Sequence, residues 1–266
     1  QAAVNAMRLV LNSICMDGII VIGEGEKDEA PMLYNGECLG TGEEPRVDIA
    51  VDPIDGTRLL SLGLPGAIAV VALSERGTMY EPGHVVYMEK LAVGPEAAHA
   101  IDITASVETN LREIARAKSV DVSDLAVVIL DRPRHEELIR QVRQAGARIK
   151  LITDGDISGG LVTALPSTGI DVLMGIGGAP EAVVLACALK CLGGNMQCKL
   201  WPRDERERQE AIAAGLDLDQ VLTIDDLVRG DNVFFSATGI TDGELVRGVR
   251  YFGKGARTDT VVMRSK

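Results

Sequence analysis

The sequence predicts an α/β fold made of two packed halves. Short apolar segments rich in β-branched residues recur along the chain, and beyond about residue 122 they alternate with segments of helical spacing. The chain has 266 residues, 46% of them hydrophobic, which is enough to bury a sizeable core. We therefore expect one half in residues 1–122, of α+β type, and a second half in residues 123–266, of α/β type.

The first half is predicted to start and end with helices that flank three strands. Residues 3–13 carry apolar side chains at helical spacing, as do residues 106–117. Residues 18–23 form an apolar run bounded by glycines, and residues 47–51 and 67–73 are also apolar and β-branched. These three runs are predicted to be buried strands.

The second half is predicted to be built from βαβ units. Strands at 126–130 and 149–152 flank a helix at 135–144. Pro180 suits the first turn of a helix that we expect to run to residue 192. The other elements predicted are a strand at 171–174, a glycine turn at 175–178, a charged and exposed helix at 200–214, and strands at 233–237 and 260–263.

The charge of the chain restricts its partners. It carries 39 acidic and 27 basic residues, a net charge of −12, which disfavours nucleic acid and anionic membranes as partners. An anionic substrate stays possible because metal ions held by carboxylates reverse the local sign. We find no apolar run long enough to span a bilayer and no leader at the N-terminus, so a soluble, cytoplasmic protein is expected. Gln1 is not an initiator Met, so we expect the natural beginning to be missing.

The five cysteines indicate neither disulfides nor a zinc knuckle. Their number is odd and they contain no C-x-x-C pair, so we expect buried, reduced thiols. The three histidines, His84, His99 and His135, form no H-x-x-x-H pair, which disfavours a zinc hydrolase. Oxygen-ligated Mg²⁺ or Mn²⁺ fits the composition better. The absence of a G-x-S-x-G elbow and of a Walker loop argues against serine hydrolases and P-loop kinases.

The strongest chemical motif is residues 52–57, which directly follow an expected strand. Asp52 and Asp55 are three residues apart with Pro53 between them, so a fixed turn can direct both carboxylates at hard cations. Gly56 lets the backbone approach a ligand, and Thr57 adds a hydroxyl able to orient a metal-bound water. All these residue types also favour plain turns. The position after a buried strand favours a site.

A second acidic segment follows the first strand. Glu24, Glu26, Asp28 and Glu29 crowd a short loop with glycines, and a bound divalent ion would relieve their repulsion. A solvated acidic loop is the alternative. Glu24 is the preferred ligand because it lies nearest the rigid strand, and we expect the other three to face solvent or to support the site indirectly.

Further polar residues follow the strands of the second half. Arg132 and Arg134 come after one strand and Asp154 and Asp156 after another, at the edge where open α/β sheets bind ligands. The arginines could clamp phosphate and the aspartates could hold sugar hydroxyls. The alternative for the two arginines is an ordinary ion pair with Glu136 or Glu137. The G-x-G-G segment that starts at Gly175 is only loosely like a phosphate loop.

Together the motifs resemble the class II fructose-1,6-bisphosphatase family. The matching segments occur in the family's order through nearly the whole chain: residues 22–34, 47–57, 87–90, 131–135, 154–156, 177–181 and 234–240. The combination is specific, whereas D-P-x-D-G-T alone is shared with wider lithium-sensitive phosphatases such as inositol monophosphatase.

The resemblance implies a sugar-phosphatase fold with αβαβα layers, often tetrameric, that uses Mg²⁺ or Mn²⁺ in gluconeogenesis to remove the 1-phosphate of fructose 1,6-bisphosphate. It also implies a metal-binding first half and a substrate-binding second half. The metal ligands it implies are Glu24, Asp52, Asp55 (Glu in some members) and Glu181, and the catalytic residues are Asp52 and Thr57. The substrate contacts it implies are Asp55, Gly56, Thr57, Tyr87, Arg132, Pro133, Arg134, Asp154, Gly155, Asp156 and Gly178.

Two departures and several alternatives accompany the resemblance. The family usually carries a Lys and a metal-binding Asp just before the residue matching Ala2, and its members continue beyond the position of Lys266. A phosphatase acting on sedoheptulose 1,7-bisphosphate or inositol monophosphate would share the metal motif. A sugar-phosphate lyase such as an aldolase, or an inactive sugar-phosphate-binding module, represents another class. We expect a small sugar bisphosphate as partner and a homo-oligomer, tetramer or dimer, as the assembly.

Overall fold

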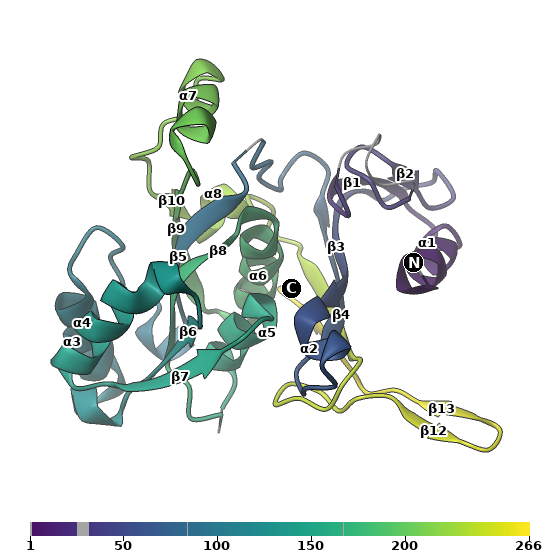
Figure 1. The fold of residues 1–266 in the computed structure, drawn as a ribbon. Coiled ribbons are helices and arrows are strands. Elements are labelled where there is room, and N and C mark those ends of the chain that lie inside the picture. Colours follow the sequence, from purple (N-terminus) through teal and green to yellow (C-terminus); the bar gives the residue numbers. More distant parts are fainter. Residues whose placement is uncertain (1, 26–31, 84, 167) are drawn as a thin grey trace.

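The computed structural model describes residues 2–25, 32–83, 85–166 and 168–266. Its helices and two large sheets stack in the order α, β, α, β, α, which Figure 1 shows from the right-hand side to the left. Three clusters of buried apolar side chains hold the layers together, and the largest surrounds the middle helices and reaches both sheets. The predicted layered α/β fold is confirmed.

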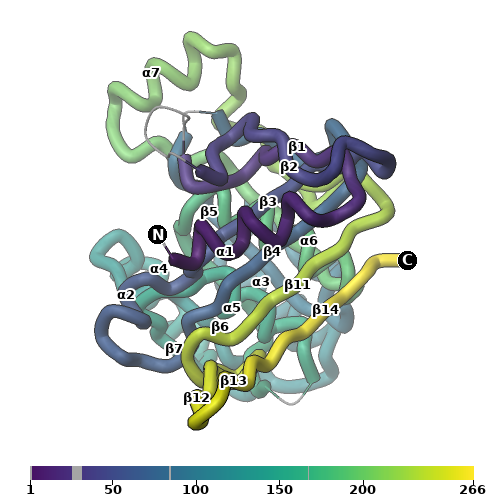
Figure 2. The backbone as a smooth tube through the Cα atoms, turned by 90° about the vertical axis from the view of Figure 1, so that its right-hand side faces the viewer, coloured from purple at the N-terminus to yellow at the C-terminus, as the bar shows by residue number. Residues whose placement is uncertain are grey.

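The first sheet has six strands in the order β14-β11-β4-β3-β1-β2. Only β1 and β3 run parallel, and every other neighbouring pair is antiparallel. Helix α1 (Ala2–Leu11) crosses the outer face of β3, where Leu11 packs with Ile20 and Ile49 (Figure 2). The strands are β1 (Asp17–Ile22), β2 (Cys38–Leu39), β3 (Arg46–Asp55), β4 (Ile68–Glu75), β11 (Phe234–Gly239) and β14 (Thr260–Arg264).

The second sheet also has six strands, in the order β10-β9-β5-β8-β6-β7. Strand β6 runs parallel to β7 and β8, whereas β5 lies antiparallel between β8 and β9. Helices α3 (Val107–Lys118) and α4 (Glu136–Ala145) cover the outer face of this sheet. The strands are β5 (Tyr87–Val93), β6 (Ala126–Leu130), β7 (Arg148–Ile152), β8 (Val172–Gly178), β9 (Asn195–Leu200) and β10 (Leu222–Thr223).

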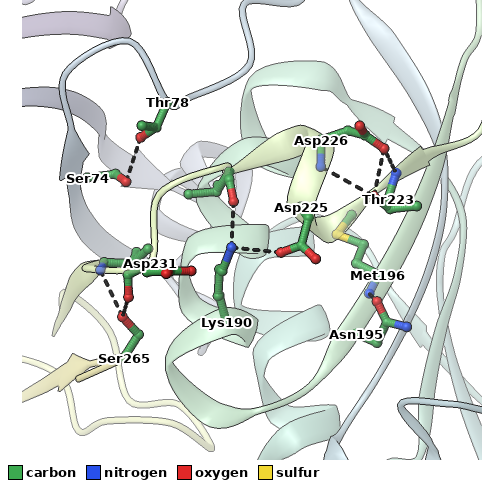
Figure 3. Close-up of polar contacts among 12 residues, drawn as sticks. Ser74, Thr78, Lys190, Asn195, Met196, Thr223, Asp225, Asp226, Asp231 and Ser265 are labelled. Carbon is green, nitrogen blue, oxygen red and sulfur yellow. Dashed lines mark hydrogen bonds and ion pairs between the residues drawn. The ribbon is translucent and has the colours of Figure 1, made fainter.

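The middle layer consists of α5 (Asp156–Leu161) and α6 (Ala179–Leu192), which lie between the two sheets. Nine of the fourteen residues of α6 are buried, because the helix contacts strands of both sheets. Its C-terminal end is held by Lys190, whose Nζ donates to Asp225 Oδ1 at 2.8 Å and to the Val228 carbonyl at 2.7 Å (Figure 3). The first turns of α5 and α6 therefore occupy fixed positions between the sheets.

Smaller elements complete the chain. Helix α7 projects at the top of Figure 1, and the two-stranded hairpin β12–β13 projects at the lower right. Their bounds are α2 (Thr57–Ser61), α7 (Glu205–Ala213), α8 (Ile224–Leu227), β12 (Arg250–Phe252) and β13 (Gly255–Arg257), with 3-10 turns at Pro95–Ala97, Val122–Asp124, Pro133–His135 and Val162–Ala164. Among the described residues, no helix combines the length and apolar character needed to cross a bilayer.

Two predictions about the second half are wrong. Residues 175–178 are the last part of β8, and they pair with β5 as far as Tyr87 opposite Gly178. Gly177 and Gly178 leave space for neighbouring carboxylates, and Gly175, with φ 135°, lies against the His135 ring. The helix predicted at 200–214 begins at Glu205, with Asp204 as its N-cap, because β9 extends to Leu200.

Each sheet takes strands from both sides of residue 122. Strand β5 lies inside the second sheet, and β11 and β14 lie in the first. The division into halves 1–122 and 123–266 therefore remains a proposal, because each sheet contains strands from both halves. The five cysteines are free thiols, but only Cys187 and Cys198 are buried, while Cys15 and Cys38 are exposed.

We expect Gly160→Ala to destabilise the protein by about 1–3 kcal/mol, the usual cost of overpacking a core. A Cβ at Gly160 would overlap the fully buried side chain of Leu185 where α5 meets α6. Urea unfolding at equilibrium measures the change. Gly253→Ala is the matched control, because a Cβ there meets nothing within 4 Å. Equal stability of the two variants would contradict close packing of α5 on α6.

Candidate active site

Acidic side chains from several elements gather at one end of the space between the sheets. Asp52 and Asp55 lie at the end of β3, Asp156 opens α5, and Glu181 lies in the first turn of α6. Glu24, just beyond β1, lies close enough for its charge to act on Asp52. The structure thus brings together all four predicted metal ligands and adds Asp156. Glu26, Asp28 and Glu29 lie outside the described residues.

These carboxylates repel one another. Burial, together with the charges of Glu181, Glu24 and Asp156, raises the pKa of Asp52 to about 7. Burial and the charges of Asp156, Asp52 and Glu181 raise the pKa of Asp55 well above its ordinary value. The pKa of Glu181 is raised by burial and by Asp156. Perturbation of this kind is typical of functional sites, where a cation offsets the repulsion.

The Glu181 carboxylate has an oxygen without a partner. Its Oε2 is buried and makes no hydrogen bond within the described part of the chain. The space around it depends on two glycines of β8, because a Cβ at Gly178 would overlap the Glu181 carboxylate and one at Gly177 would overlap that of Asp156. An unpaired buried carboxylate oxygen is costly unless something binds it. This oxygen is thus a candidate ligand for a cation.

A lysine lies among the acids. Lys90 is 2% exposed on β5, and its Nζ is 2.6 Å from Asp156 Oδ2. Burial alone would lower the pKa of Lys90, but the charges of Asp156 and Glu181 raise it above its ordinary value. We predicted no role for this residue. The structure buries Met88 and Lys90 on β5 and exposes Glu89 between them. This alternation could have indicated a buried Lys90, but we did not predict that strand.

The donor set suits a hard divalent cation. All candidate ligands are carboxylates, and three of them, Asp52, Asp55 and Glu181, have pKa values raised by mutual repulsion and burial. Lys90 neutralises Asp156 but leaves the orphan oxygen of Glu181 unbound. Within the described ranges, no group of three or more His, Cys, Asp or Glu side chains is already arranged to hold an ion. A cation would therefore draw these carboxylates together.

Thr57 lies beside the acids at the start of α2, with its side chain exposed. The preceding Gly56 has φ 86°, a left-handed conformation that only glycine adopts readily, and it turns the chain from β3 into α2. The Arg58 N–H donates to Asp154 Oδ2 at 3.0 Å, and the Ser158 N–H donates to Asp55 Oδ2 at 3.3 Å. These bonds fix the turn that carries Thr57 against the loop that opens α5.

The predicted arginines lie on the second sheet, near Tyr87. The Arg134 guanidinium lies 4.9 Å from the centre of the Tyr87 ring and donates to the Ile176 carbonyl, 2.8 Å from Nη2. Burial lowers the pKa of Arg134. Arg132 donates to the Thr153 carbonyl at 2.8 Å and lies 3.9 Å from Asp154. Within the described residues neither arginine pairs with Glu136 or Glu137, so the ion-pair alternative is wrong.

Neighbouring residues hold this wall in place. The Tyr87 ring packs edge-on against Trp201, with the ring centres 6.2 Å apart. His135 is buried, with Nδ1 2.6 Å from the Leu130 carbonyl and Nε2 accepting the Ile176 N–H at 2.7 Å. Burial lowers the pKa of His135, which fits a neutral ring. Pro133 opens the 3-10 turn that carries Arg134, and Gly155 directly precedes α5.

Comparisons with known proteins identify a family and similar enzymes. The family model described as "Bacterial fructose-1,6-bisphosphatase, glpX-encoded" matches residues 1–266. A protein of Synechococcus sp. (strain JA-2-3B'a(2-13)), named D-fructose 1,6-bisphosphatase class 2/sedoheptulose 1,7-bisphosphatase, is 48% identical over 291 aligned positions, which cover 100% of this chain and 84% of the relative. The fructose-1,6-bisphosphatase class 2 of Haemophilus influenzae is 46% identical over 279 positions, with coverages of 100% and 84%.

In protein stripped of divalent ions by a chelator, Asp52→Asn should stabilise the fold at neutral pH. A carboxyl whose pKa rises from 3.8 to about 7 on folding binds protons more tightly when folded, so wild-type stability falls as pH rises between these values. The stabilisation by Asn should therefore shrink as pH falls toward about 4. Urea unfolding across this range measures it.

The control for this change is Asp102→Asn. A hydrogen bond from Thr104 lowers the pKa of Asp102, so this variant should lose stability at neutral pH instead. Adding Mn²⁺ should reverse the order of wild type and Asp52→Asn, because the ion binds the carboxylate better than the amide. A stabilisation by Asn that grows toward acid pH would contradict the raised pKa.

Lys90→Met should destabilise the protein by about 3–5 kcal/mol, because removing one partner of a buried ion pair leaves the other charge unpaired. The pair is Lys90 with Asp156, and both are buried. The double variant Lys90→Met/Asp156→Asn should recover part of the loss, since no buried charge is left alone at this pair. Chemical denaturation of the single and double variants measures the coupling. If the double variant lost as much stability as Lys90→Met alone, the pair would not act as a unit.

Proposed function

The chain belongs to the bacterial, glpX-encoded fructose-1,6-bisphosphatase family, and from this premise we propose that it hydrolyses the 1-phosphate of fructose 1,6-bisphosphate. The products are fructose 6-phosphate and inorganic phosphate, as gluconeogenesis requires. The family is one of metal-dependent phosphatases. The observation that carries the proposal is the buried carboxylate cluster, which contains an unbound Glu181 oxygen and the aspartates that come just before the exposed Thr57.

We propose Glu24, Asp52, Asp55 and Glu181 as the residues that hold the metal, with Mg²⁺ or Mn²⁺ as the ion. An all-oxygen donor set favours these hard cations over zinc. These carboxylates would hold the cation, which would stabilise charge on the phosphoryl oxygens and lower the pKa of a water molecule. The raised pKa values of Asp52, Asp55 and Glu181 support this assignment, because each carboxylate ionises more readily once a cation is near.

Thr57 and Asp52 are proposed as the catalytic residues. Thr57 is exposed and stands on a turn that is fixed by the bond from Arg58 N to Asp154. The Thr57 hydroxyl oxygen can accept a hydrogen bond from the attacking water and thereby orient this water in line with the phosphoryl group. Asp55 is held by the Ser158 N–H, so its carboxylate keeps its direction.

The second phosphate of the substrate is proposed to bind at Arg132 and Arg134. Arg134 directs two N–H groups to one carbonyl and retains others for a ligand, while the Tyr87 ring supports its guanidinium. Binding of the remote phosphate then positions the reacting end. The other substrate contacts proposed are Gly56, Pro133, Asp154, Gly155, Asp156 and Gly178.

Sedoheptulose 1,7-bisphosphate is a second candidate substrate. The Synechococcus relative, at 48% identity, carries this activity in its name together with fructose bisphosphatase. Both sugars present a 1-phosphate and a phosphate at the far end, so the same two regions would serve. We further propose that the protein acts in the cytoplasm as a homo-oligomer, dimer or tetramer.

The natural full-length protein should release inorganic phosphate from fructose 1,6-bisphosphate when Mn²⁺ or Mg²⁺ is present and none with chelator. Thr57→Ala should lower kcat by about 100-fold or more with little change in KM, because positioned proton-transfer groups contribute roughly 10²–10⁴-fold. Thr57→Ser keeps the hydroxyl and is the matched control.

Phosphate assays with both bisphosphates measure these rates. Release of triose phosphate without inorganic phosphate would indicate a lyase, and binding without turnover would indicate a module that only binds sugar phosphate. An equal loss of kcat in Thr57→Ala and Thr57→Ser, or a loss confined to KM, would contradict the proposed role of the hydroxyl.

A further inference from the structure

The hairpin β12–β13 extends away from the body of the molecule. We call residues 247–257 the arm; its strands pair Arg250 with Arg257 and Phe252 with Gly255 (Figure 1). The base is anchored by the Val249 N–H, which donates to the Ile240 carbonyl at 3.2 Å. Every residue of both strands is exposed. A two-stranded hairpin is only marginally stable by itself in water, so an arm of this kind calls for a partner surface.

The tip of the arm presents aromatic side chains to solvent. Tyr251 is 84% exposed and Phe252 is 62% exposed. The whole chain has only three Phe, four Tyr and one Trp, so two of its few aromatic rings stand at the end of a projection. Aromatic side chains that become buried on association are the usual anchors of protein interfaces. The arm therefore has the apolar component of a docking element.

The arm also carries concentrated positive charge. Four of the 27 basic residues of the chain lie in residues 247–257, and none of its 39 acidic residues does. Arg250 stands directly opposite Arg257, a repulsive cross-strand pair. Three of these arginines, Arg247, Arg250 and Arg257, line a hollow of about 300 Å³ with Thr258 and Asp259.

These arginines have little compensation from their own chain. Within the described residues, the side chains of Arg247 and Arg257 make no ion pair, and Arg250 reaches only Asp242, at 3.9 Å. Carboxylates from another molecule in the hollow would relieve the repulsion and bind bidentately.

We propose that the arm docks on an acidic surface of a second copy of this chain. The arm is basic, and the rest of a chain with a net charge of −12 is acidic, so two copies are complementary where the arm of one meets the body of the other. The same acidic body would repel a nucleic acid approaching the arm. In a two-fold dimer each copy contributes one arm and one receiving surface, so the contacts of Tyr251 and Phe252 occur twice in the interface.

Analytical ultracentrifugation of the full chain tests the proposal. Wild type should sediment as an oligomer, and Tyr251→Ser/Phe252→Ser and Arg250→Glu/Arg257→Glu should each weaken self-association at least tenfold. The matched controls are Leu9→Ser/Val10→Ser, which changes apolar residues 75% and 60% exposed on α1, and Arg112→Glu/Arg116→Glu on α3. Unchanged thermal unfolding and circular dichroism of the arm variants, measured above the dissociation range, show that they fold.

A photo-reactive benzoylphenylalanine at position 251 locates the receiving surface. In a mixture of isotope-labelled and unlabelled copies, cross-links should join the arm of one copy to an acidic peptide of the other. Arm variants that assemble like wild type, control variants that dissociate equally, a monomeric wild type, or cross-links confined to one copy would each overturn the proposal. Phosphatase activity is measured separately, so its absence would count against the proposed function and leave this test readable.

Discussion

The repulsion among buried carboxylates is the constraint on which the rest of the site depends. Asp52, Asp55, Asp156 and Glu181 share one end of the space between the sheets, and burial there strengthens every charge interaction. Within the described residues, only Lys90 offsets them with a direct ion pair, and it pairs with Asp156. The remaining acids carry raised pKa values, which means that the fold keeps them near one another at a cost in stability. A divalent cation turns that cost into binding free energy.

The surrounding fold is arranged so that this repulsion does not push the acids apart. Glu181 lies in the first turn of α6, where the helix dipole favours a negative charge, and α6 itself is clamped between both sheets. Gly177 and Gly178 end β8 without side chains, because any Cβ would occupy the space of the Asp156 or Glu181 carboxylate. Packing of the middle layer thus fixes the backbone, and only the carboxylates remain free to rearrange.

Polar residues that follow an apolar strand could be predicted from the sequence. Strands without a continuous apolar pattern could not. Asp52 and Asp55 were predicted as a site because they follow a buried strand, and Asp154 and Asp156 because they follow another at the ligand-binding edge of an α/β sheet. Glu181 was added to the metal ligands only through the family resemblance. Strand β5 was missed because Glu89 and Lys90 interrupt its apolar residues, and its neighbours β8 and β9 are distant in sequence. Residues 175–178 were predicted as a turn because glycines usually mark turns; here they provide space.

The pairing of Lys90 with Asp156 divides the acids into two kinds. Asp156 has a counter-ion in Lys90, so this pair can hold its orientation whether or not metal is bound. Asp52, Asp55 and Glu181 have none, so their charge state depends on the cation. Since Asp52 and Asp55 belong to the first sheet and Glu181 to α6, a cation that they share would tie the first sheet to the middle layer. Metal binding and the packing of the first sheet against α6 are therefore coupled.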